Sequence, residues 1–154
     1  MAEHRCPCDV CDQIALCVAG EHPRLVAELG QTWVVMGPHQ KWPGYVVLLC
    51  KQAVTELHEL DSKANTELMA ELVLVGKAVQ RATNAHKLNT ESLGNVCPHL
   101  HWHIFPRQSD EPGAHDPVWV QMADAAEYAY EAGKHSALRD ELAKTIVGQD
   151  EVIE

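Results

Sequence analysis

The sequence lacks long apolar runs and an excess of basic residues. No segment approaches the roughly 18 consecutive apolar residues of a membrane span, and residues 1–8 contain no apolar stretch typical of a signal peptide. Lys and Arg number 12 against 22 Asp and Glu, and the formal net charge is −10. Because long nucleic acids are bound through clustered cations, we expect neither a nucleic-acid polymer nor a membrane as a partner, and we expect a cytoplasmic protein.

The length and composition suit one globular domain. A chain of 154 residues with 46% hydrophobic residues can bury most of its apolar surface in a single core. The sequence therefore predicts a single domain over residues 1–154. In a reducing compartment, its six cysteines are expected to be thiols or metal ligands rather than disulfides.

Three histidines stand at alternate positions in the stretch His99–Arg107. Large apolar residues separate His99, His101 and His103. Successive side chains of a β-strand point to opposite faces, so this spacing predicts a strand that presents all three imidazoles on one side. At about 3.3 Å of rise per residue the row is roughly 13 Å long, enough to lie along a phosphate ester and its neighbours.

Such a row has two interpretations, metal ligands or groups that attack and protonate an anion. Neighbouring residues on one face of a strand stand about 7 Å apart, whereas zinc requires nitrogen ligands at about 2.1 Å. Geometry therefore favours catalysis, although one histidine could join metal ligands from elsewhere in the chain. Neutral imidazole, with an ordinary pKa of about 6.5, is also a good nucleophile near pH 7.

The stretch from His99 to Phe105 resembles the histidine triad of the HIT superfamily, and Pro106-Arg107 continues it as in many members. Pro43-Gly44-Tyr45 and the strand after it extend the similarity, which covers roughly residues 8–107. The resemblance implies that His101 is the nucleophile, which attacks the α-phosphorus of a nucleotide and forms a nucleotidyl-histidine. Residues 108–154 are then expected to form a C-terminal helical extension to this core.

The resemblance also implies the roles of other residues. His99 and His103 are expected to hold the tautomer of His101 and to steady the phosphate oxygens. The acidic residue with which family members grip the ribose hydroxyls falls at Gly37, so the ribose contacts are expected to differ. The residues assigned to substrate binding are Asn89, Gly94, Asn95, His39 and Arg107.

Cys8 and Cys11 have the spacing of half a zinc site. Many HIT proteins complete such a pair with a distant histidine and with the first histidine of the triad, which is His99 here. The distant histidine falls on Ala53 in this chain. Two other thiols could replace it, namely Cys6 and Cys50. We expect that no cofactor is required, with a structural zinc ion as the alternative.

Alternating strand and helix patterns predict an α+β fold with a HIT-like, mostly antiparallel sheet of about five strands and helices packed on it. Asp61 is a plausible N-cap for the longest helix, and Gly20 a plausible C-cap for the first. Strands are expected over residues 25–29, 32–36, 45–50, 87–91 and 99–107. Helices are expected over residues 14–20, 62–85, 123–132 and 136–147.

These expectations favour a nucleotide hydrolase or transferase that acts at the α-phosphate of a dinucleoside polyphosphate, such as Ap4A, or of a nucleoside phosphoramidate. Two other classes stay open: a nucleotide-binding sensor or adaptor without turnover, and a zinc-stabilised interaction domain. An enzyme is favoured because three aligned imidazoles followed by an arginine are more than binding requires. A homodimer is expected by analogy with the family alone.

Overall fold

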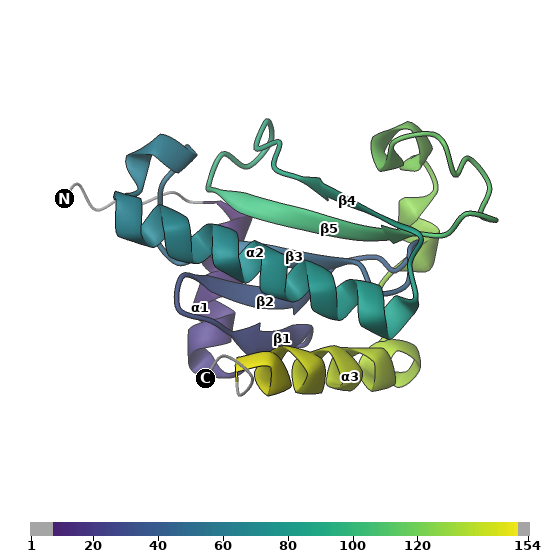
Figure 1. Ribbon diagram of the computed structural model, residues 1–154, viewed down its shortest axis with the longest axis horizontal. Coiled ribbons are helices and arrows are strands. Elements are labelled where there is room, and N and C mark those ends of the chain that lie inside the picture. The colour runs from purple at the N-terminus through teal and green to yellow at the C-terminus, as the bar shows by residue number, and fades with distance from the viewer. Residues whose placement is uncertain (1–7, 151–154) are drawn as a thin grey trace.

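The computed structural model describes residues 8–150 and contains a five-stranded antiparallel sheet in the order β1-β2-β3-β5-β4 (Figure 1). The strands are β1 (Leu25–Glu28), β2 (Thr32–Met36), β3 (Val46–Cys50), β4 (Lys87–Glu91) and β5 (His101–Arg107). The helices are α1 (Asp9–Ala19), α2 (Ser62–Thr83) and α3 (Ala132–Asp150), with short 3-10 turns η1 (Leu57–Glu59), η2 (Val118–Gln121) and η3 (Ala125–Tyr128). The predicted α+β class and the mostly antiparallel HIT-like sheet of about five strands are confirmed.

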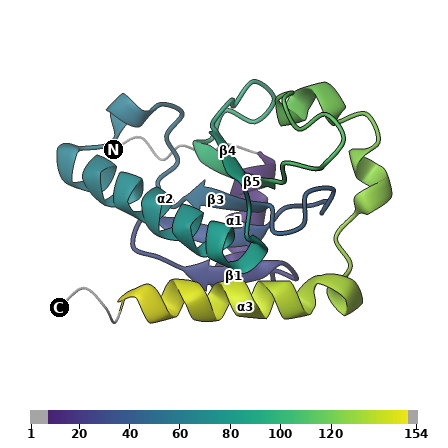
Figure 2. The ribbon, with the colours of Figure 1, turned by 45° about the vertical axis from the view of Figure 1, so that its right-hand side comes forward.

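The sheet has a core on each face. On one face α2 and α3 lie side by side and bury Val79 and Leu142 against strand residues such as Leu48 (Figure 2). On the other face α1 buries Val10 among aromatic and aliphatic residues of the strands. Because strand side chains alternate, His101, His103, Phe105 and Arg107 of β5 share the α1 face of the sheet. The candidate chemistry therefore lies on the face that α1 covers only in part.

Local sequence signals explain where several elements begin and end. The Asp61 side chain accepts a hydrogen bond from the backbone N–H of Ala64 and caps α2, as predicted. Gly20 ends α1 in the left-handed conformation at φ 72°, as its C-cap position predicts. The strands expected at 32–36 and 87–91 match β2 and β4.

The structure differs from the expectation in four elements. β5 begins at His101 rather than at residue 99, because the backbone N–H of Leu100 donates to the carbonyl of Val54 in the loop after β3. α1 begins at Asp9, five residues earlier than expected, and α3 begins at Ala132 instead of residue 136. The helix expected over 123–132 is wrong except for η3: the Tyr130 N–H donates to the carbonyl of Pro38, so tertiary pairing extends the chain there.

The segment after β5 crosses back over the strand ends and continues through η2 and η3 into α3 (Figure 1). Within residues 8–150, no helix combines the length and the hydropathy that crossing a membrane requires.

Candidate active site

His101 is held in one tautomer by the backbone. Its Nδ1 atom lies 2.6 Å from the carbonyl oxygen of His99. A carbonyl oxygen can only accept, so Nδ1 of His101 carries the proton and donates, and Nε2 of the neutral ring carries the lone pair. The expected influence of His99 on the tautomer of His101 is therefore exerted through its main chain. His101 enters the site with one nitrogen equipped for nucleophilic attack.

His103 lies next to His101, with ring centroids 4.9 Å apart. Its Nδ1 atom lies 2.5 Å from the hydroxyl of Tyr45, and its ring stacks on that of Phe105 at 5.9 Å. Burial, followed by the neighbouring imidazoles of His101 and His39, lowers the pKa of His103 to about 4. Burial also raises the pKa of Tyr45. Both groups are thus neutral near pH 7.

Two cavities meet at His101. One of about 120 Å³ lies between α1 and the strands and is lined by His101, His103 and Tyr45, with Arg24 opposite. The other, of about 320 Å³, is lined by His101, Gly94 and the loop that follows β3. His101 therefore borders two spaces, one toward α1 and one toward the loop after β3.

Arg24 supplies positive charge to the smaller cavity, a role that the sequence analysis missed. Its Nε atom donates to the carbonyl of Met36, and one terminal nitrogen donates to the side chain of Gln13. These bonds fix the guanidinium beside the two histidines of the cavity. No local sequence signal marks Arg24, because 77 residues of chain separate it from His101 and only the fold brings them together.

The ring of His99 does not join those of His101 and His103 in the smaller cavity. His99 is buried, with 1% of its surface exposed. Its Nε2 atom lies 2.7 Å from the carbonyl oxygen of Cys50, so Nε2 carries the proton and donates. Its Nδ1 atom lies 3.3 Å from Sγ of Cys11. The first histidine of the row thus belongs to a cysteine cluster behind the site.

That cluster has the composition of a metal site. The ligand atoms of Cys8, Cys11 and His99 all lie within 4.8 Å of one another. Sγ of Cys8 accepts a hydrogen bond from the backbone N–H of Cys11 at the start of α1. The sequence analysis named all three of these residues as candidate ligands, and the structure brings their ligand atoms together. The Cys50 side chain packs in the core of the opposite face, and Cys6 lies outside the described residues.

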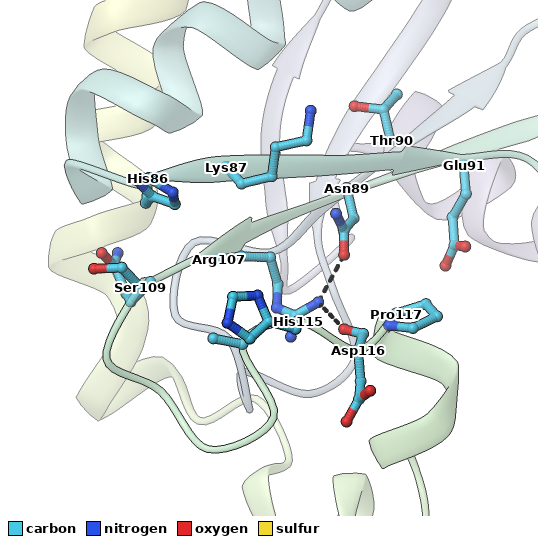
Figure 3. A pocket seen from close by; sticks show the side chains of 12 residues that line it. His86, Lys87, Asn89, Thr90, Glu91, Arg107, Ser109, His115, Asp116 and Pro117 are labelled. Carbon is cyan, nitrogen blue, oxygen red and sulfur yellow. Dashed lines mark hydrogen bonds between the residues drawn. The ribbon is translucent and has the colours of Figure 1, made fainter.

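Arg107 and Asn89 occupy a different part of the sheet. Arg107 is 3% exposed, and one terminal nitrogen donates to Oδ1 of Asn89 and to the carbonyl of Asp116, each at 2.7 Å (Figure 3). Its other donors reach Glu111 and the carbonyl of Gly113. Six residues of strand, about 20 Å, separate Arg107 from His101. The structure does not bring this pair to the histidines.

The pair lines a larger cavity of about 470 Å³ between β4 and the loop after β5 (Figure 3). Exposed His86 and Lys87 stand at one end of it, and Asp116 and Pro117 at the other. Because the Arg107 guanidinium donates its hydrogen bonds to the loop after β5, it holds that wall of the cavity in place.

The remaining predicted residues divide between the two regions. Gly94 lines the 320 Å³ cavity and has φ +70°, a conformation that favours glycine. Asn95 is exposed in the same loop and lines neither cavity at His101. His39 lies behind Tyr45, with ring centroids 5.0 Å apart, and burial lowers its pKa. His39 therefore contacts Tyr45 and lines neither cavity at His101.

Fold and histidine arrangement together define the class of protein. The HIT domain family model matches residues 23–110, more than half of the chain, and the chain therefore belongs to the HIT domain family. The match includes the triad, Arg24 and Tyr45.

Known proteins resemble the chain at modest identity. A histidine triad protein from Bradyrhizobium japonicum is 27% identical, with a TM-score of 0.72 over 79% of this chain and 89% of that one. A histidine triad protein from Sinorhizobium meliloti is 26% identical, with a TM-score of 0.69 over 81% and 87%. The asymmetrical bis(5'-nucleosyl)-tetraphosphatase of Schizosaccharomyces pombe is 26% identical over 85 residues, 52% of this chain. The chain spans about half the length of that curated relative, 47%.

Proposed function

We propose that this HIT protein hydrolyses or transfers at the α-phosphate of a nucleoside polyphosphate or phosphoramidate, through a covalent nucleotidyl-His101. A dinucleoside polyphosphate such as Ap4A is the preferred substrate class, because a relative is an asymmetrical bis(5'-nucleosyl)-tetraphosphatase. The observation that carries the proposal is the hydrogen bond from Nδ1 of His101 to the carbonyl of His99, which leaves a lone pair on Nε2 of a residue that lines two cavities.

The reaction divides into two displacements. Nε2 of His101 attacks the α-phosphorus, and the bond from phosphorus to the bridging atom of the leaving group breaks with its electron pair going to that group. Water then attacks the same phosphorus and loses a proton, and the N–P bond breaks to restore the lone pair of Nε2. Nucleoside monophosphate and the protonated leaving group are the products.

Neighbouring groups support these steps by position and charge. Arg24 faces the developing negative charge on the phosphate oxygens. Tyr45 donates to Nδ1 of His103, so that His103 keeps a proton on Nε2 and offers it to a phosphate oxygen. Because burial lowers the pKa of His103 to about 4, this donor is a neutral imidazole throughout the physiological range.

A substrate panel tests the proposal. Adenosine and guanosine polyphosphates, dinucleoside polyphosphates and phosphoramidates are assayed with wild type and with His101→Ala. One class should be turned over by wild type alone, while His101→Ala keeps nucleotide affinity. The matched control is His86→Ala, which removes an exposed imidazole just before β4 and should retain full activity. Turnover by His101→Ala at the wild-type rate contradicts the covalent mechanism.

A second candidate is a nucleotide sensor without turnover. It is favoured by two departures from the pattern that the resemblance implies: Gly37 stands where members have the acid that grips the ribose, and Ala53 stands where they have a metal-binding histidine. Binding of nucleotides across the same panel with no product from wild type selects this candidate.

A structural zinc ion belongs to the same proposal. Two thiols and an imidazole within 4.8 Å fit a zinc site, and the Nε2–H donation of His99 to Cys50 leaves Nδ1 as the ligand atom toward Cys11. Cys8, Cys11 and His99 would hold the ion, which would tie the start of α1 to the segment before β5. The zinc content of untagged protein purified without chelator measures its presence.

A homodimer is also proposed. β4 forms one edge of the sheet of residues 8–150, and its outer main chain has no strand beside it in the described protomer. A second copy is the partner that a symmetric assembly would place there. Sedimentation velocity over a range of concentrations distinguishes a dimer from a monomer.

A further inference from the structure

A closed circuit of hydrogen bonds connects His22, Gln13 and Arg24. Nδ1 of His22 accepts from the backbone N–H of Arg24 at 3.0 Å, and Nε2 of His22 lies 3.1 Å from Oε1 of Gln13. The same oxygen of Gln13 accepts from Nη2 of Arg24 at 3.2 Å, so the circuit begins and ends at Arg24. Gln13 and Arg24 line the 120 Å³ cavity, whereas His22 does not line it and has 6% of its surface exposed.

The chemistry of the partners fixes the direction of every bond in this circuit. Nε2 of Gln13 lies 2.6 Å from Oδ2 of Asp9. A guanidinium only donates and a carboxylate only accepts, so the amide oxygen of Gln13 faces Arg24 and its nitrogen faces Asp9. A backbone N–H also only donates, so Nδ1 of His22 carries the lone pair and Nε2 carries the proton. The Nε2–H of His22 therefore holds the Gln13 amide in the orientation that Arg24 requires.

The circuit requires a neutral His22. Burial, followed by the guanidinium of Arg24, lowers the pKa of His22, although the carboxylate of Asp9 opposes this shift. A second proton on the ring would lie on Nδ1 and would face the backbone N–H of Arg24, which is itself a donor. Near pH 7 the ring is therefore in the one tautomer that can donate to Gln13.

The other anchor of Arg24 is Met36 in β2. Nε of Arg24 donates to the carbonyl of Met36 at 3.0 Å, and the backbone N–H of Met36 donates to the carbonyl of Arg24 at 2.8 Å. Within residues 8–150 no hydrogen-bond partner is found for Nη1 of Arg24, so its two N–H groups remain for a substrate oxygen in the cavity. The two anchors, at Nε and at Nη2, together set the direction in which Nη1 points.

We infer that His22 and Gln13 are positioning residues: His22 orients the amide of Gln13, and Gln13 aims the guanidinium of Arg24 at the phosphate of the substrate. The inference rests on the proposed function, in which Arg24 faces the negative charge of the phosphate oxygens. The effect of both residues on catalysis passes through Arg24. This dependence can be measured, and a purely structural role would not show it.

Single and double variants test the link between Gln13 and Arg24. Gln13→Met keeps a side chain of similar length without the acceptor, and it should lower kcat/KM by about 3- to 10-fold, the equivalent of one hydrogen bond. In an Arg24→Met background the same change should have no further effect, because the guanidinium that Gln13 holds is gone. Gln31→Met is the matched control: it removes a hydrogen bond to Glu67 away from the cavity and should leave kcat/KM unchanged.

Two substitutions separate the roles of the two nitrogens of His22. His22→Gln places a side-chain N–H near the position of Nε2 and keeps the donor to Gln13. His22→Asn places an oxygen near the position of Nδ1, which keeps the bond to the backbone of Arg24 but leaves Gln13 without that donor. His22→Gln should stay within about twofold of the wild-type kcat/KM, whereas His22→Asn should lose about 3- to 10-fold. Urea denaturation establishes that each variant is folded before its kinetics are compared.

The contrary outcomes distinguish the inference from the proposed function. If wild type neither binds nor turns over any nucleotide of the panel, both fall together. If wild type binds a nucleotide without turnover, the dissociation constant replaces kcat/KM in every comparison. If Gln13→Met retains the wild-type value, or lowers it equally with and without Arg24, the inference alone is overturned. A loss in His22→Gln as large as that in His22→Asn overturns it as well.

Discussion

The phenol ring of Tyr45 fills the space in front of the Cα atom of Gly37, where an added Cβ would lie 2.1 Å from Cδ1 of Tyr45. The ring cannot retreat, because Phe105 stacks on it at a centroid distance of 4.0 Å and its hydroxyl is bonded to His103. Position 37 is where the family resemblance places the acid that grips the ribose. Tyr45 and Gly37 are therefore a matched pair, and no side chain fits at 37 while Tyr45 keeps its place.

Gly37→Ala should destabilise the protein by about 1–3 kcal/mol, the usual cost of overpacking a buried site. In a Tyr45→Ala background the same change should cost far less, because the ring that clashes is gone. Urea denaturation of the four proteins measures both costs. Gly133→Ala is the control: no atom lies within 4 Å of its added Cβ, and in helix α3 it should stabilise by about 0.5 kcal/mol. Additive costs at positions 37 and 45 contradict the pairing.

Elements whose causes are local could be predicted from the sequence. Asp61 caps α2 with its own side chain, and the β-branched and aromatic composition of residues 32–36 suffices for β2. The segment 123–132 could not be predicted, because its Ala-rich composition favours a helix while a contact with Pro38, some 90 residues away, extends the chain. Tertiary contacts override propensity there.

The candidate site divides in the same way. The His101 and His103 pair follows from strand alternation, which a single stretch of sequence displays. Arg24 comes to the site from a distant segment, and no spacing in the sequence connects it to the histidines. His99 has the right spacing for the row, but β5 begins two residues after it and its ring packs in the cysteine cluster.

The second prediction concerns acid stability. Burial and the two neighbouring imidazoles lower the pKa of His103 from 6.5 to about 4, so between these values the unfolded chain binds more protons than the folded protein. Stability therefore rises with pH through this window and is lost on acidification, by up to about 3 kcal/mol from His103. His103→Gln should flatten the dependence of the unfolding free energy on pH between 7 and 4.5.

Urea denaturation at several pH values provides that measurement. Burial also lowers the pKa of His22 and of His39, so both wild type and His103→Gln keep a pH dependence of stability from those two groups. The difference between the two proteins therefore isolates the contribution of His103. His58→Gln, at an exposed imidazole, should follow wild type. An unchanged slope in His103→Gln means that His103 is not held neutral by its surroundings.

The third prediction separates Arg24 from the other residues of the cavity. Arg24→Met should lower kcat/KM by about 10- to 100-fold, the equivalent of losing a charged hydrogen bond to the phosphate. Arg24→Lys keeps the charge without the fork of donors and should recover part of the loss. Steady-state kinetics on the substrate found in the panel gives both values, and a thermal melt checks that the bonds to Met36 and Gln13 are not needed for folding. Equal kcat/KM in wild type, Arg24→Met and Arg24→Lys would show that Arg24 does not contact the substrate.

The fourth prediction is that Arg107 stabilises the fold and does not bind the nucleotide. Arg107→Met removes the guanidinium donors to Glu111 and to the carbonyls of Gly113 and Asp116. Removing one partner of a buried ion pair typically costs about 3–5 kcal/mol, so the variant should unfold at markedly lower urea concentration. Limited proteolysis should cut it sooner within residues 108–117, whereas KM of the folded fraction should stay within about twofold, because Arg107 lies about 20 Å along the strand from His101.

Arg139→Met, which breaks an exposed pair with Asp140, should change stability by less than about 0.5 kcal/mol. A raised KM at unchanged stability would instead place Arg107 in the substrate site.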